Sequence, residues 1–152
     1  MKPLRHFLTW LMVLALLAPA AHADQMLIIR SGQDFEGAML TLQNAISAQG
    51  YKVARVQRVD VGLEARGYKT DKYRVVFYGK PDEFALLAGK HPQLMPFLPL
   101  NIAIFAEADQ TLLSTNRPSV LGEFFPAAEL KPVFALWEKD LLEILEKVRE
   151  AR

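Results

Sequence analysis

The spacing of apolar residues switches from a strand-like pattern to a helical one and back along this chain, and that order limits the fold more than any other feature. Residues 26–30 form a short apolar run with β-branched side chains, which is typical of a strand. From Phe35 to Ile46 the apolar residues instead recur at helical spacing, and Gly50 follows as a C-terminal cap. The folded part is therefore predicted to begin with a strand and an amphipathic helix.

Strand-like segments dominate the middle of the chain, and a second helical pattern closes it. The four further strands predicted here cover residues 51–61, 73–78, 101–107 and 111–115, with a polar connection over 63–70 and a short helix over 82–90. From about Lys131 the helical spacing returns and continues to the end. The order β-α-β(4)-α predicts an α+β two-layer sandwich, an antiparallel sheet with helices on one face.

The first 23 residues precede this pattern and differ from it. Lys2 and Arg5 give a positive start, residues 7–18 are apolar apart from one threonine, and an Ala-His-Ala step at 21–23 places small residues where a signal peptidase reads them. A membrane anchor is the alternative, but a spanning helix needs about 20 apolar residues. We therefore expect a cleaved signal peptide over residues 1–23, export to the periplasm, and a mature form without a transmembrane segment.

Composition narrows the class of protein that remains after this leader is removed. Residues 24–152 hold 16 basic and 17 acidic side chains, so the net charge is −1 and bulk charge does not indicate a nucleic-acid partner. There is no cysteine, which excludes disulfides and thiolate chemistry and suits an oxidising compartment. The 129 residues, without internal repeats or a linker, are expected to form one domain.

Three short motifs, taken in order, resemble a known family. They are Ser-Ala-Gln-Gly-Tyr at 47–51, Gly-Lys-Pro at 79–81 and Leu-Pro-Leu at 98–100. Their order and spacing are similar to those of the DUF302 family, a domain of unknown function, over residues 26–115. The resemblance implies a TBP-like fold of order β-α-β(4)-α in small domains that pair as dimers. It implies no catalytic residues, and Lys80 stands where the family usually has asparagine.

The segment from residue 91 to residue 100 is apolar but cannot form regular structure. Prolines at 92, 96 and 99 are incompatible with a regular helix or a central strand. Its large side chains must either fold back against the first helix, near Met39 and Leu42, or stay open as a binding surface. We place the candidate ligand site in the wider segment 79–101, where Lys80 and His91 flank the apolar residues, and expect a small apolar or anionic ligand. The predicted residues of the site are Lys80, His91, Met95 and Phe97.

The sequence supports catalysis and metal binding less than it supports a ligand site. No common catalytic motif occurs, and His91 is the only histidine after the leader and thus the only candidate general base with an ordinary pKa near neutrality. A copper site built from His91, Met95 and Met39 has suitable ligand types, but methionine at helical spacing is more often core filler. We therefore assign no catalytic residue, no metal and no cofactor.

The last helix carries more apolar surface than one buried stripe needs, which is about three residues per heptad. The surplus predicts a homodimer, and the alternative is deeper burial of the helix in its own domain. The residues predicted for the dimer interface are Leu136, Trp137, Leu141 and Leu142.

These features together favour a small exported binding or interaction domain without catalysis. Two alternatives stay open, namely an enzyme of unknown class that uses His91 and a purely structural subunit that dimerises through its last helix. Neither composition nor spacing identifies the ligand.

Overall fold

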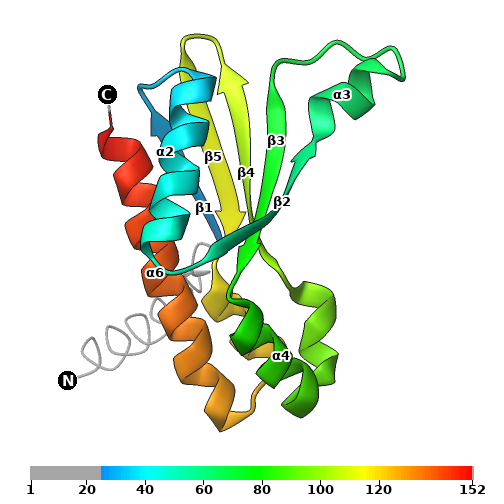
Figure 1. The fold of residues 1–152 in the computed structure, drawn as a ribbon, viewed down its shortest axis with the longest axis vertical. Coiled ribbons are helices and arrows are strands. Elements are labelled where there is room, and N and C mark those ends of the chain that lie inside the picture. Colours follow the sequence, from blue (N-terminus) through cyan, green and yellow to red (C-terminus); the bar gives the residue numbers. More distant parts are fainter. Residues whose placement is uncertain (1–24, 152) are drawn as a thin grey trace, which may run out of the picture.

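Five strands form one antiparallel sheet in the computed structural model, which describes residues 25–151 (Figure 1). The order across the sheet is β1-β5-β4-β3-β2, so the first and second strands of the chain lie at opposite edges. The strands are β1 (Met26–Ser31), β2 (Lys52–Arg58), β3 (Tyr73–Gly79), β4 (Leu100–Glu107) and β5 (Gln110–Asn116). The predicted α+β class and antiparallel sheet are confirmed. The predicted signal peptide lies outside the described residues.

Two long helices, α2 (Phe35–Ala48) and α6 (Lys131–Glu150), pack side by side against the sheet (Figure 1). The Asp34 side chain caps α2 by accepting a 2.8 Å hydrogen bond from the Gly37 N–H. The helical stripe predicted from the sequence is confirmed. The buried residues of α2 are Phe35, Ala38, Met39, Leu42, Ala45 and Ile46.

The hydrophobic core lies between these helices and one face of the sheet. Burial alternates along β4, where Leu100, Ile102 and Ile104 are buried and the residues between them are not. Phe134 and Trp137 of α6 are among the largest fully buried side chains. Within residues 25–151, no helix combines the length and the apolar character that crossing a bilayer requires.

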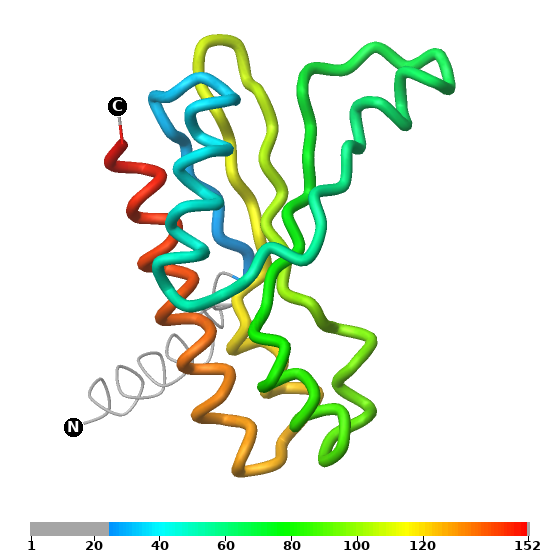
Figure 2. Tube along the Cα trace, in the orientation of Figure 1, coloured from blue at the N-terminus to red at the C-terminus, as the bar shows by residue number. Residues whose placement is uncertain are grey.

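The segment after β2 departs from the prediction. Residues 59–64 form a short helix, α3 (Val59–Glu64), where a continued strand to residue 61 and a loop were expected. The reason is pairing: the last β2–β3 pair is Arg58 with Arg74, so the β-branched residues beyond it have no partner strand. Figure 2 shows that residues 59–72, between β2 and β3, project from the sheet as an arm, and a buried Asp60–Arg74 ion pair anchors this arm at its base.

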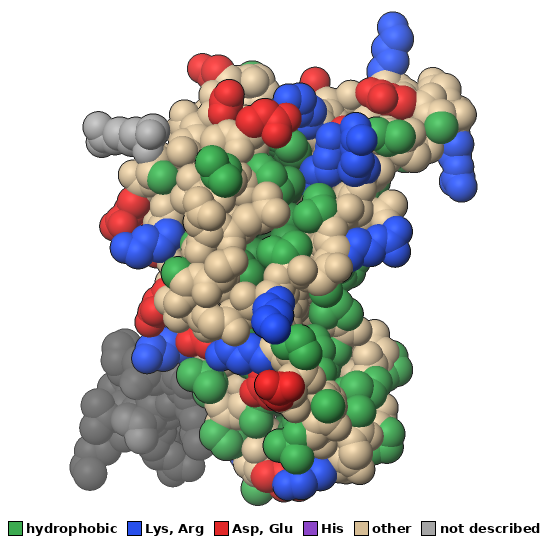
Figure 3. Space-filling model, in the orientation of Figure 1, with side chains coloured by type: hydrophobic (Ala, Val, Ile, Leu, Met, Phe, Trp, Pro, Cys, Tyr) green, Lys and Arg blue, Asp and Glu red, His purple; other side chains and the backbone are tan. Residues whose placement is uncertain are grey.

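Short helical segments gather beyond the end of the sheet, beside the first half of α6 (Figure 1). They are α4 (Pro81–Lys90), η1 (Pro92–Phe97), η2 (Pro118–Val120), α5 (Leu121–Phe124) and η3 (Ala128–Leu130). Figure 3 shows hydrophobic side chains concentrated on the surface at this end. The step from β3 into α4 needs glycine at residue 79, because an added Cβ would lie 2.2 Å from the Phe84 ring.

The proline-containing segment 91–100 belongs to this end of the molecule. It forms the 3₁₀ helix η1, in which Leu94 is fully buried, and its Leu98–Pro99 peptide bond is cis. The segment packs mainly against α4 and not against the first helix near Met39 and Leu42, and of the two expected outcomes each holds for part of it, because Leu94 is buried whereas Phe97 is half exposed. The reason is that α4 carries the chain past the end of the sheet before η1 begins (Figure 1).

Candidate functional site

A cavity of about 440 Å³ opens where the two central strands separate. The pairing of β4 with β5 ends at Ala103 and Ser114. Beyond that point β4 stays paired with β3 as far as Leu100, and β5 stays paired with β1 as far as Asn116. The sheet therefore opens between β4 and β5 at one end only, and the space between the diverging strands becomes the cavity.

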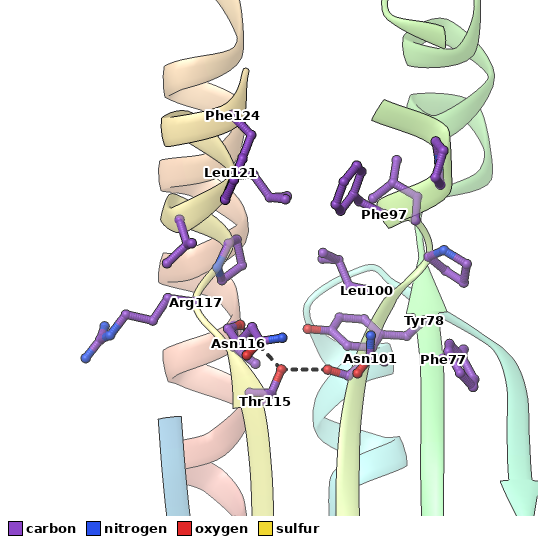
Figure 4. A pocket seen from close by; sticks show the side chains of 16 residues that line it. Phe77, Tyr78, Phe97, Leu100, Asn101, Thr115, Asn116, Arg117, Leu121 and Phe124 are labelled. Atoms are coloured by element: carbon purple, nitrogen blue, oxygen red, sulfur yellow. Dashed lines mark hydrogen bonds between the residues drawn. The ribbon is translucent and has the colours of Figure 1, made fainter. Parts of the chain in front are cut away.

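Apolar side chains approach this gap from two sides (Figure 4). Phe97 and Leu100 come from η1 and β4, whereas Leu121 and Phe124 come from α5 and face them across the opening. Phe97 is 50% exposed and Phe124 is 67% exposed, so both aromatic rings border the mouth. An aromatic surface of this kind, left open to solvent beside a cavity, is typical of a binding site.

The polar groups of the lining are mostly uncharged. The Thr115 hydroxyl donates a 2.6 Å hydrogen bond to the Asn101 carbonyl, which joins the two strands where their ladder has ended. Asn116 lies beside this bond (Figure 4). The charged lining residue, Arg117, turns its guanidinium away from the gap, and its Nη1 lies 2.9 Å from Oε1 of Glu138.

Tyr78 of β3 forms the inner end of the cavity. It is only 1% exposed, and its ring packs edge-on against Tyr51 with ring centroids 5.4 Å apart. Figure 4 shows its hydroxyl directed into the gap between β4 and β5. Within residues 25–151 this hydroxyl makes no hydrogen bond to another group, and its oxygen is accessible from the cavity. Burial, together with the charge of Asp140, raises the pKa of Tyr78 well above its ordinary value.

A polar cluster lies behind Tyr78, in the core. The Tyr51 hydroxyl donates a 2.8 Å hydrogen bond to Oδ2 of Asp140, and Nζ of Lys80 lies 3.5 Å from the same oxygen. The Lys80 ammonium also lies 4.2 Å from the centre of the Tyr51 ring. Burial and the hydrogen bond to Asp140 raise the pKa of Tyr51. Lys80 therefore serves as an internal counter-ion for a buried carboxylate.

The four residues predicted as a ligand site are not brought together. Phe97 lines the cavity, whereas Lys80, His91 and Met95 do not. The largely buried His91 side chain has its Nε2 3.6 Å from Oε1 of Glu129. Met95 packs against the core. Across residues 25–151, no three acidic or histidine side chains come together in a way that could hold a metal ion.

Sequence reasoning did not select Tyr78, Leu121 or Phe124 for the site. The one signal for Phe124 was its place beside a second phenylalanine, Phe125, in a segment with neither a helical nor a strand-like apolar spacing. Tyr78 carried no such signal. It belongs to an apolar strand, and burial in the core is enough to explain a tyrosine there.

The residues predicted for a dimer interface divide into two kinds. Trp137 and Leu141 are fully buried in their own chain, and Leu141 lines the cavity from behind. Leu136 and Leu142 are exposed. These two lie six residues apart, which puts them roughly 120° apart around the helix, so they do not form one narrow stripe.

The fold and the cavity together define a small two-layer α+β domain with an apolar site at one end of a split sheet. The chain belongs to the family described as domain of unknown function DUF302, whose profile matches residues 27–150. The resemblance seen in its motifs is thus confirmed.

A solved structure supports the fold. It is the crystal structure of the uncharacterized conserved protein DUF302 from Bacillus stearothermophilus, with a TM-score of 0.76 and 20% sequence identity. The match covers 84% of this chain and 100% of that one. A search of the curated proteins found no match.

Proposed function

We propose that this protein is an exported, non-catalytic binding domain that takes a small, largely apolar and uncharged ligand between η1 and α5. The cavity carries this proposal. Its volume of about 440 Å³ lies in the range of small-molecule sites, about 300–1,000 Å³. Apolar side chains dominate its walls. The apolar lining residues include Phe97, Leu98, Leu100, Val120, Leu121 and Phe124.

The charges around the cavity favour an uncharged ligand over the anionic one that the sequence also left open. Arg117 is already paired with Glu138, so the cavity wall offers an anion no free cation. Lys80 is held by Asp140, and His91 lies beside Glu129. An ionic ligand buried here would lose its hydration without gaining a partner, which is costly.

The alternative of an enzyme using His91 has less support. The side chain of His91 is largely buried, its neighbour is the Glu129 carboxylate, and it is not part of the cavity wall. Export to the periplasm belongs to the proposal as well, and it rests on the leader pattern of residues 1–23.

Titration of the purified protein with Nile red, a neutral dye that fluoresces in apolar surroundings, tests the proposal. Phe124→Ala and Leu121→Asn should each weaken dye binding about five- to tenfold, because they remove apolar surface from the wall. Tyr68→Ala is the matched control, since Tyr68 is 63% exposed and lies on the arm far from the cavity. No dye binding, or equal loss in the control, would overturn the proposal.

Phe97→Ala separates a binding role from a core role at the same site. A fully buried phenylalanine costs about 3–5 kcal/mol when cut to alanine. Phe97 is half exposed and meets Phe125 edge-on at 5.3 Å, so its removal should change stability much less than that. Dye affinity should fall as it does for Phe124→Ala. Unchanged dye affinity would remove Phe97 from the proposed site.

A further inference from the structure

We infer that the Tyr78 hydroxyl is the hydrogen-bond donor of this cavity, and that the ligand is an apolar molecule carrying a neutral acceptor such as a carbonyl or ether oxygen. The inference rests on the proposed function and narrows it. It names both the ligand class and the group that would select it.

The Tyr78 side chain is placed to reach into the cavity. Tyr78 pairs with Leu100 across β3 and β4, and its side chain reaches from there to the point where β4 and β5 have separated. In Figure 4 the hydroxyl faces the space that Phe97 and Leu121 border from either side. A ligand seated among the apolar walls would therefore meet this hydroxyl at its inner end.

The unmet hydrogen-bonding capacity of Tyr78 also supports a donor role. Buried polar groups in proteins nearly always have a partner, and the neighbouring Tyr51 follows this rule by donating to Asp140. The Tyr78 residue is as deeply buried as Tyr51, but its hydroxyl makes no hydrogen bond within the described part of the chain and its oxygen stays accessible from the cavity instead of being sealed in the core. Its orientation into the cavity leaves that bond to be made with a ligand atom.

The protonation of Tyr78 and the state of the other polar groups in the wall determine which kind of ligand atom fits. A tyrosine hydroxyl is protonated at physiological pH, and burial raises the pKa of Tyr78 further, so this hydroxyl can donate. Thr115 does not compete, because its hydroxyl already donates to the Asn101 carbonyl. Asn116 is exposed, and water competes for its amide. Since the wall offers no free cation, the acceptor that fits is uncharged.

Benzophenone and diphenylmethane form a matched pair for the test, because they differ only in a carbonyl against a methylene. Their affinities are measured by displacement of Nile red from the wild-type protein and from Tyr78→Phe. The wild type should prefer benzophenone about three- to tenfold, as a single net hydrogen bond allows. Tyr78→Phe should lose that preference and bind diphenylmethane as the wild type does.

Tyr51→Phe is the control, because it removes the same group from a buried tyrosine whose hydroxyl faces Asp140 and not the cavity. It should keep the preference for benzophenone. If Tyr78→Phe keeps it too, or if the wild type shows none, the donor role is overturned while the cavity stands. If neither compound nor the dye binds, the proposed function itself fails.

The wild type also offers a readout that does not depend on how Tyr78→Phe folds. The ¹³C resonance of the Tyr78 ring carbon bonded to the hydroxyl should move on adding benzophenone and stay in place with diphenylmethane. Equal shifts with both compounds would contradict the inference.

Discussion

The Thr115 hydroxyl donates to the Asn101 carbonyl across 2.6 Å, at the first position where β4 and β5 are no longer paired. One side chain thereby holds the two strands together at the edge of the cavity. Beyond this bond β4 stays paired with β3 and β5 stays paired with β1, so the two halves of the sheet diverge there.

Thr115→Val should destabilise the fold by about 1–2 kcal/mol, because it leaves a part-buried carbonyl without its donor while keeping a β-branched shape. Urea unfolding measures this change. Thr70→Val is the control, since the Thr70 hydroxyl bonds only the carbonyl of the next residue. Equal changes in the free energy of unfolding for the two substitutions would show that the bond across the gap stabilises the fold no more than the local bond of Thr70 does.

Gly79→Ala should destabilise by about 1–3 kcal/mol, because the new Cβ would lie 2.2 Å from the Phe84 ring and the ring must move. Gly89→Ala in α4 is the control, since nothing lies near its added Cβ, and helix propensity predicts a neutral or stabilising effect of up to about 1 kcal/mol. Thermal unfolding measures both. In a Phe84→Leu background the cost of Gly79→Ala should shrink, and an unchanged cost would contradict the steric explanation.

Asp60 and Arg74 form a buried ion pair at the base of the arm. Burial alone would raise the pKa of Asp60, but hydrogen bonds from Arg74 and from the Val61 N–H outweigh it and hold the pKa below its usual range. Asp60→Asn should destabilise by about 1–3 kcal/mol at neutral pH, because Arg74 loses its counter-ion. Asp71→Asn, on an exposed residue of the same arm, is the control and should have little effect.

The same pair predicts a pH dependence. Because the folded state holds the Asp60 pKa below the unfolded value of about 3.9, the stabilisation is complete above pH 4 to 5. It is lost as the pH falls through the lowered folded value. The stability gap between wild type and Asp60→Asn, followed by urea unfolding from pH 7 to pH 2, should therefore close on the acid side. A gap that stays constant over this range would contradict the assignment.

Processing of the leader should place the N-terminus of the exported protein at Asp24. Intact-mass measurement of periplasmic protein checks this directly. Ala23→Arg should block cleavage, because the peptidase requires a small residue there. An unprocessed Met1 in the periplasmic fraction would contradict the signal peptide.

The predicted homodimer can be tested by separating exposed from buried residues of α6. If the helix mediates a dimer, Leu136→Gln and Leu142→Gln should each shift sedimentation at tens of micromolar towards the monomer. Trp137→Ala should instead lower stability by about 3–5 kcal/mol whatever the concentration, because Trp137 fills the core. A wild-type monomer under these conditions would end the dimer proposal.

The elements that depend on local patterns can be located from the order of the amino acids alone. Apolar spacing located α2 and α6, short β-branched runs located the strands, and their order predicted the antiparallel α+β fold. Each of these patterns reports how one segment buries one face, which is a property of residues close together in the chain. The glycine of the motif at 79–81 also has a local explanation, because a Cβ at Gly79 would collide with the ring of Phe84, which is only five residues further along the chain.

The place of the cavity and the residues that reach it depend on contacts between distant parts of the chain. Val59 and Val61 favour a strand locally, but the pairing of β2 with β3 ends at Arg58 and Arg74, and both valines lie in α3. Tyr51 and Tyr78 look alike in sequence, yet one hydroxyl meets Asp140 from α6 and the other faces the gap. The physical reason is that strand pairing and side-chain partners join residues far apart in the chain, and no local period records those contacts.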